Sequence, residues 1–62
     1  MDKHEAVELF SLPKQMLPYL PDTLPDGITD IWEADKGFYW EVWYEQDGEM
    51  RKMWLMKEPI EN

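Results

Sequence analysis

The chain contains no cysteine among its 62 residues, which excludes disulfide bonds and thiolate metal ligands. A domain this small must therefore gain its stability from dense apolar packing or from association with another chain. Histidine is also scarce: His4 is the only one, and it lies in what we predict to be the first turn of a helix. No serine or cysteine stands at a motif spacing from His4, so we expect no catalytic residues and no enzymatic activity.

Glycine and long apolar runs are scarce too. The three glycines all lie in predicted turns, and none belongs to a glycine-rich phosphate-binding loop. No apolar run approaches the roughly 18 residues that a membrane-spanning helix needs. Residues 1–6 show no basic leader followed by an apolar core. We therefore expect no signal peptide and predict a cytoplasmic protein.

Positive charge is the third deficit. Six lysines and arginines stand against 14 aspartates and glutamates, which gives a net charge of −8. Nucleic acids and anionic membrane surfaces attract basic proteins, so we expect neither as a partner. The carboxylates show no spacing typical of a calcium loop, and we predict no metal and no cofactor. The charge is compatible with a basic protein partner.

Aromatic residues, by contrast, are abundant, with four tryptophans, three tyrosines and two phenylalanines. Residues 28–57 hold all four tryptophans in three apolar runs, which are separated by turn signals at 34–37 and 47–48. Short runs rich in aromatic and β-branched residues, bounded by Asp and Gly, are typical of strands. The pattern predicts a three-stranded antiparallel β-meander.

The first 27 residues are predicted to cover this meander. Residues 2–10 show a helical spacing of apolar side chains, and Asp2 is a suitable N-cap. The following segment repeats Leu-Pro pairs and ends in a turn at Gly27, so we predict a stiff, Pro-rich connector. The predicted fold is α+β, a single domain of residues 1–62 with helix and connector over 1–27, meander over 28–57 and a tail over 58–62.

Which side chains share a face depends on the register of the two hairpins, because a slip of one residue turns a strand over. For the first hairpin we expect Trp32 opposite Trp40. For the second, a two-residue turn places Trp40 opposite Leu55, whereas a three-residue loop places it opposite Trp54. We prefer the three-residue loop, since it collects most of the large aromatic residues on one face.

In this register the other face keeps large apolar side chains for which residues 1–27 provide little cover. A central Trp and Tyr surrounded by charged residues is the composition of a protein interface. An exposed edge strand offers a second route to binding. The predicted partner-binding residues are Ile31, Tyr39, Trp43, Met53 and Leu55, with Glu41 and Glu45 at the rim.

These features favour a non-enzymatic, small acidic binding protein that acts through the aromatic sheet face or an edge strand. A regulator or inhibitor of a basic protein partner, carried by a phage or another mobile element, fits this description by association. Two alternatives stay open. One is a homodimer or larger homo-oligomer that serves as an assembly component, and the other is a platform for a carbohydrate or small ligand.

Overall fold

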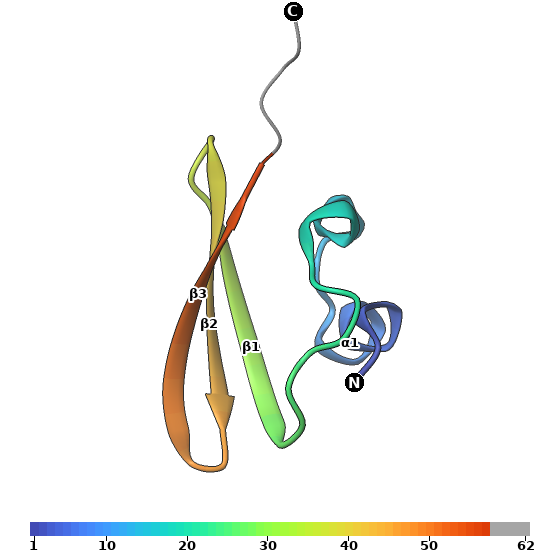
Figure 1. Cartoon of the computed structure of the whole chain (residues 1–62), viewed down its shortest axis with the longest axis vertical. Coiled ribbons are helices and arrows are strands. Elements are labelled where there is room, and N and C mark those ends of the chain that lie inside the picture. The colour runs from blue at the N-terminus through green and yellow to red at the C-terminus, as the bar shows by residue number, and fades with distance from the viewer. Residues whose placement is uncertain (58–62) are drawn as a thin grey trace, which may run out of the picture.

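The computed structural model describes residues 1–57. It contains a helix, a 3₁₀-helix and three strands: α1 (Lys3–Phe10), η1 (Lys14–Tyr19), β1 (Ile28–Asp35), β2 (Tyr39–Gln46) and β3 (Glu49–Met56). The strands pair antiparallel in the order β1-β2-β3, which confirms the α+β fold with a β-meander. In Figure 1 the helices lie to one side of the sheet, next to β1. The tail predicted over 58–62 lies outside the described residues.

Helix α1 begins where the sequence predicts. Asp2 has extended backbone dihedrals, and its Oδ1 accepts a hydrogen bond from the His4 N–H at 2.7 Å. This bond satisfies one of the free amides of the first turn and holds the pKa of the Asp2 carboxyl below its usual range. Ser11 ends the helix in the left-handed region with a φ of 56°, and its N–H bonds back to the last turn.

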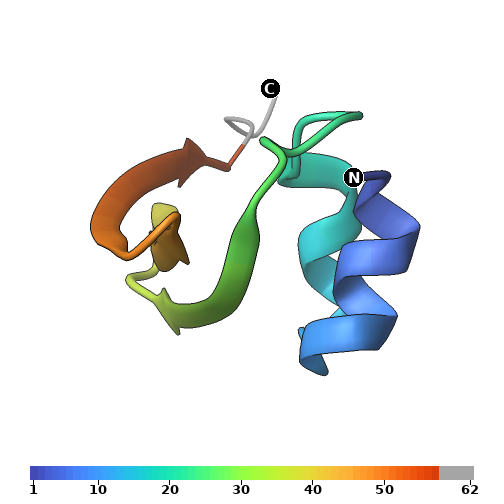
Figure 2. The same ribbon diagram turned by 90° about the horizontal axis from the view of Figure 1, so that it is seen from below.

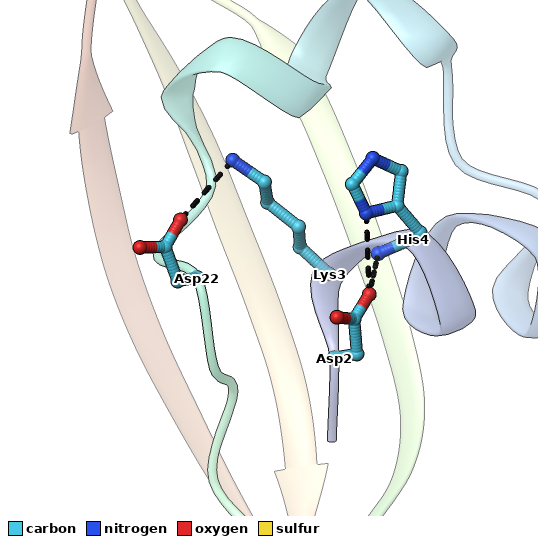
Figure 3. A network of polar contacts seen from close by, with 4 residues as sticks. All are labelled: Asp2, Lys3, His4 and Asp22. Carbon is cyan, nitrogen blue, oxygen red and sulfur yellow. Dashed lines mark hydrogen bonds and ion pairs between the residues drawn. The ribbon is translucent and has the colours of Figure 1, made fainter.

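A short antiparallel bridge between Asp2 and Thr23 fixes the start of α1 to the end of the connector. Lys3 supports the bridge twice: its N–H donates to Asp22 O at 3.3 Å, and its Nζ lies 3.3 Å from Asp22 Oδ1 (Figure 3). On the same turn, His4 Nδ1 lies 3.2 Å from Asp2 Oδ1, and the ring is exposed. His4 is therefore a surface side chain whose contact with Asp2 helps to order the first turn of α1.

The connector folds back on α1 before it reaches the sheet. Its helix η1 lies beside α1 (Figure 2), and Met16 of η1 is completely buried. In the later Leu-Pro pairs, Leu20 and Leu24 are buried whereas Pro21 and Pro25 are exposed. The prolines restrict the unfolded chain and the leucines provide the apolar packing, so this segment completes a helical layer.

The register of the first hairpin differs from the prediction. Trp32 lies opposite Trp43 and not opposite Trp40, which instead faces Asp35. The reason is that β1 continues through Asp35, whose Oδ1 accepts a hydrogen bond from the Gly37 N–H at 2.9 Å. Gly37 adopts a φ of 91°, which suits glycine. The shift is an odd number of residues, so Trp32 and Trp40 lie on opposite faces of the sheet.

The second hairpin uses the two-residue turn, and the preferred three-residue loop is wrong. Trp40 lies opposite Leu55, and Val42 lies opposite Met53. Asp47 and Gly48 form the turn with φ values of 51° and 83°. A type I′ turn requires positive φ at both central positions, and Asp-Gly is one of the dipeptides that accept this most readily. The turn chemistry therefore sets the register.

The two registers place one set of large side chains against the helices, on what we call the inner face of the sheet. These residues form a single apolar cluster with the helical layer. Its members are Ala6, Val7, Leu12, Met16, Leu20, Leu24, Ile28, Ile31, Trp40, Val42, Tyr44 and Leu55. Val42, on the central strand, is only 2% exposed. Burial of each large side chain of this kind stabilises the fold by roughly 1.5–3 kcal/mol, so the inner face is the main source of stability.

Candidate functional site

The opposite side of the sheet, which we call the outer face, faces away from the helices and carries a second set of large side chains. The residues of the outer face follow from the alternation along each strand, since successive side chains point to opposite faces. Its members are Asp30, Trp32, Ala34, Tyr39, Glu41, Trp43, Glu45, Met50, Lys52, Trp54 and Met56. Three of the four tryptophans therefore lie on the face that the helices leave open.

Much of the outer face is accessible to solvent. Trp32 is 44% exposed and Trp54 is 59% exposed, while Met50 and Met56 are exposed at the two ends of β3. Trp43 lies between Trp32 and β3 and is partly buried. Several large apolar side chains exposed on one face of a sheet are typical of a binding surface.

Lys52 lies among the aromatic rings at the centre of β3. Its Nζ is 5.8 Å from the centroid of the Trp43 ring and 5.4 Å from that of Trp54. The same nitrogen lies 3.5 Å from Glu41 Oε1, and Lys36 Nζ lies 3.9 Å from Glu41 Oε2. A cation near the faces of two indole rings gains cation–π stabilisation, so this surface already accommodates one basic side chain.

Two carboxylates lie directly opposite each other at the end of the outer face nearest the Asp-Gly turn. Asp30 of β1 pairs in register with Glu45 of β2. Asp30 Oδ1 accepts the Ile31 N–H at 3.0 Å, and Glu45 Oε1 accepts the Thr29 hydroxyl at 3.3 Å. Within residues 1–57 no lysine or arginine nitrogen lies within 4.0 Å of either carboxylate. Like charges opposite each other are unfavourable, so this end of the face attracts cations.

A separate ion pair closes the far end of the inner face. Lys57 Nζ lies 2.8 Å from Asp35 Oδ1 and 4.9 Å from the centroid of the Trp40 ring. The lysine, together with the Gly37 N–H, holds the pKa of the Asp35 carboxyl below its usual range. Lys57 lies over the ring of Trp40, and the pair belongs to the fold, not to the open surface.

The structure separates the predicted partner-binding residues into two groups. Tyr39, Glu41, Trp43 and Glu45 lie together on the outer face. The remaining predictions belong to the inner face: Ile31 and Leu55 are buried in the core, and Met53 packs against it. This division is a direct result of the two register errors.

The tryptophans that are exposed on the outer face are not among the residues that the sequence predicts to bind a partner. The predicted register places Trp32 and Trp54 on the same face as Trp40, whereas in the structure both are exposed on the outer face. The Asp47-Gly48 dipeptide carries the signal that identifies them, because a type I′ turn at these residues fixes the side on which Trp54 emerges.

Other parts of the described chain provide weaker candidates for a functional site. Across residues 1–57 no group of three His, Cys, Asp or Glu side chains is arranged to hold a metal ion. An open depression on α1 is lined by His4, Glu5, Glu8 and Leu9. In the same part of the chain, no helix has the length and apolar character that crossing a membrane requires.

Comparison with known proteins gives no identification. No protein-family model, curated protein or solved structure matches this chain. The outer face must therefore be interpreted from its own chemistry.

Proposed function

We propose that this protein acts by binding, without catalysis, and that its outer face contacts a basic surface of another protein. The observation that carries the proposal is the exposure of Trp32 and Trp54 on a sheet face that the helical layer does not cover. Tryptophan is among the residues most enriched at the energetic centres of protein interfaces. Burial of a tryptophan adds much to the stability of a core this small. The exposure of Trp32 and Trp54 therefore favours a functional role for them.

The charge of the chain supports a basic partner. Within residues 1–57 every lysine and arginine except Lys14 forms an ion pair with a carboxylate of the same chain. The excess of carboxylates is therefore available to an external cation, and Asp30 and Glu45 place two of them beside Trp32 and Trp43. An arginine or lysine of a partner would gain both a carboxylate contact and a ring face at this place.

The proposal includes a biological role for this binding. A small acidic protein that covers a basic surface acts as a regulator or inhibitor by occlusion, in the manner of proteins carried by mobile elements. A cytoplasmic location stays a prediction.

The proposal is tested by affinity capture from an extract of the source cell with matched variants. We expect the wild-type protein to retain a basic protein, and the Trp32→Ala/Trp54→Ala double variant to bind it at least about tenfold more weakly, because interface tryptophans contribute more than about 1 kcal/mol each. Phe38→Ala is the control, since Phe38 is an 84% exposed aromatic residue in a loop. Equal retention by the double variant and the control would contradict the proposal.

The acidic part of the surface has its own test. The Asp30→Asn/Glu45→Gln variant should weaken binding to the same partner and reduce its dependence on salt. A captured partner that is acidic, or binding that is insensitive to both salt and this variant, would remove the argument for a basic surface.

A further inference from the structure

Along β3, the backbone N–H and C=O groups of successive residues point alternately toward β2 and away from it. The Lys57 N–H donates to Phe38 O at 3.1 Å, so the backbone groups of Lys57 point toward β2. In an antiparallel ladder this direction repeats every second residue, so the odd-numbered residues 49–55 also point toward β2. The N–H and C=O groups that point away from the sheet therefore belong to Met50, Lys52, Trp54 and Met56.

This outer edge of β3 is open. The strand order ends at β3, and within residues 1–57 no backbone hydrogen bond from another segment reaches the four outward residues. Their side chains lie on the outer face, where Met50, Trp54 and Met56 are 60%, 59% and 68% exposed. Natural edge strands are usually guarded by charges, prolines or bulges, and here Lys52 is the one charged residue of the four.

The opposite edge of the sheet is protected. By the same alternation, the outward backbone groups of β1 belong to Ile31, Glu33 and Asp35. The Ile31 N–H is already bonded to Asp30 Oδ1 at 3.0 Å, and the pairing is irregular at the start of the strand. Two of the three outward residues are acidic. Of the two sheet edges within residues 1–57, the β3 edge is therefore the one suited to accept another strand.

We propose that the outer edge of β3 pairs antiparallel with β3 of a second copy of this chain, across a two-fold axis at Met53. The pairing joins the two sheets into one continuous sheet with three strands from each copy. A two-fold contact requires a self-complementary strand, in which each residue finds a suitable partner in the same sequence read backwards. The proposal goes beyond the function proposed above and does not depend on it.

The sequence of β3 is self-complementary about Met53. With the axis at this residue, Met50 lies opposite Met56 of the second copy, and Lys52 lies opposite Trp54. These two pairs involve all four outward residues. The first joins two apolar side chains, and the second places a cation beside an aromatic ring. On the inner side Arg51 lies opposite Leu55, and Glu49 lies opposite Lys57, the lysine that also pairs with Asp35, so that opposite charges meet at each end of the contact.

The neighbouring registers are disfavoured by charge. An axis at Lys52 places this lysine opposite itself in the second copy. An axis at Trp54 places Arg51 opposite Lys57, twice in each dimer. Like charges directly opposite each other on adjacent strands are destabilising, so the charge pattern of β3 favours the axis at Met53 over both neighbouring axes.

The first test compares two substitutions at Lys52 by sedimentation at physiological ionic strength, where the repulsion between two acidic chains is screened. Lys52→Ala and Lys52→Pro both remove the ion pair with Glu41, but only the proline removes the outward N–H. We expect a wild-type dimer, and a dissociation constant at least about tenfold larger for Lys52→Pro than for Lys52→Ala, because two interchain hydrogen bonds are lost. A wild-type chain that stays monomeric up to ~1 mM overturns the proposal. Equal dimerisation of the two variants, with unchanged circular dichroism, overturns it as well.

The second test is a charge exchange, which stays decisive if Lys52→Pro fails to fold. Glu49→Lys or Lys57→Glu alone places like charges opposite each other across the axis and should weaken the dimer, while the double variant should restore it. Within one chain these residues lie at opposite ends of a strand, roughly 26 Å apart at ~3.3 Å per residue, so restoration requires contact between two copies. A double variant that dimerises no better than the single variants overturns the register.

Discussion

The two faces of the sheet carry the same kinds of residues in opposite environments. On the inner face, Trp40 is 5% exposed and lies in the apolar cluster with Val42 and the helical layer. On the outer face, Trp54 is 59% exposed and contacts Lys52. Tryptophan content alone therefore says little about the core of this protein. The position of each residue relative to the turns decides whether it holds the fold together or remains available for contact.

The largest expected effect comes from truncating a tryptophan on each face. Trp40→Ala should lower the free energy of unfolding by about 3–5 kcal/mol, because it opens a cavity in the core. Trp54→Ala should lower it by only about 0.5–1 kcal/mol, through loss of the contact with Lys52. Urea denaturation of dilute protein, followed by circular dichroism, measures both values. Comparable losses for the two variants would show that the faces are not distinct.

A smaller effect is expected from the like-charge pair on the outer face. Glu45→Gln removes one of the two opposed carboxylates and should raise the free energy of unfolding by a few tenths of a kcal/mol. Glu33→Gln changes the net charge equally, but Glu33 lies opposite Val42, so it should give less stabilisation. Urea midpoints for the two variants isolate the pair from the general effect of net charge. Equal midpoints would indicate that Asp30 and Glu45 do not repel each other.

The smallest effect concerns the ion pair that closes the inner face. Because the folded-state pKa of Asp35 is lowered, its contribution to stability is complete above the unfolded value of 3.8 and is lost as the pH falls through the lower, folded value. Lys57→Met removes the main cause, so the pKa of Asp35 should rise toward 3.8. Carboxyl NMR titration measures it, with Asp2 as the internal control, since its lowered pKa depends on His4. An Asp35 pKa that does not move would assign the shift to the Gly37 N–H.

The sequence was sufficient to predict α1 and the three strands of this fold. The Asp2 cap and the helical spacing after it predicted α1, and the apolar runs between turn signals predicted the three strands. These features depend on neighbouring residues and on local backbone chemistry, so a single sequence contains them. The exposure of a second aromatic face was also predicted, because residues 1–27 provide material for only one layer.

The faces themselves were not predicted correctly, because strand register depends on small differences between competing turns. The preferred register, which gathered the most aromatic residues on one face, placed Trp32 and Trp54 in the core together with Trp40. The backbone preference of Asp47-Gly48 for a type I′ turn outweighed that gain and placed Trp54 outside. In the first hairpin the longer β1 and the loop closed at Gly37 had no comparably specific signal in the sequence.

The central claim, that the sheet separates its tryptophans between a core face and an open face, is tested most directly by hydrogen exchange of the indole N–H groups. Trp40 Nε1 is buried and has no hydrogen-bond partner among the described residues, whereas Trp32 and Trp54 are exposed. In dilute protein, the indole signal of Trp40 should exchange slowly, at a rate set by opening of the fold. The signals of Trp32 and Trp54 should exchange rapidly. Slow exchange of Trp54 together with Trp40 would contradict the account, because it would place both residues in the core.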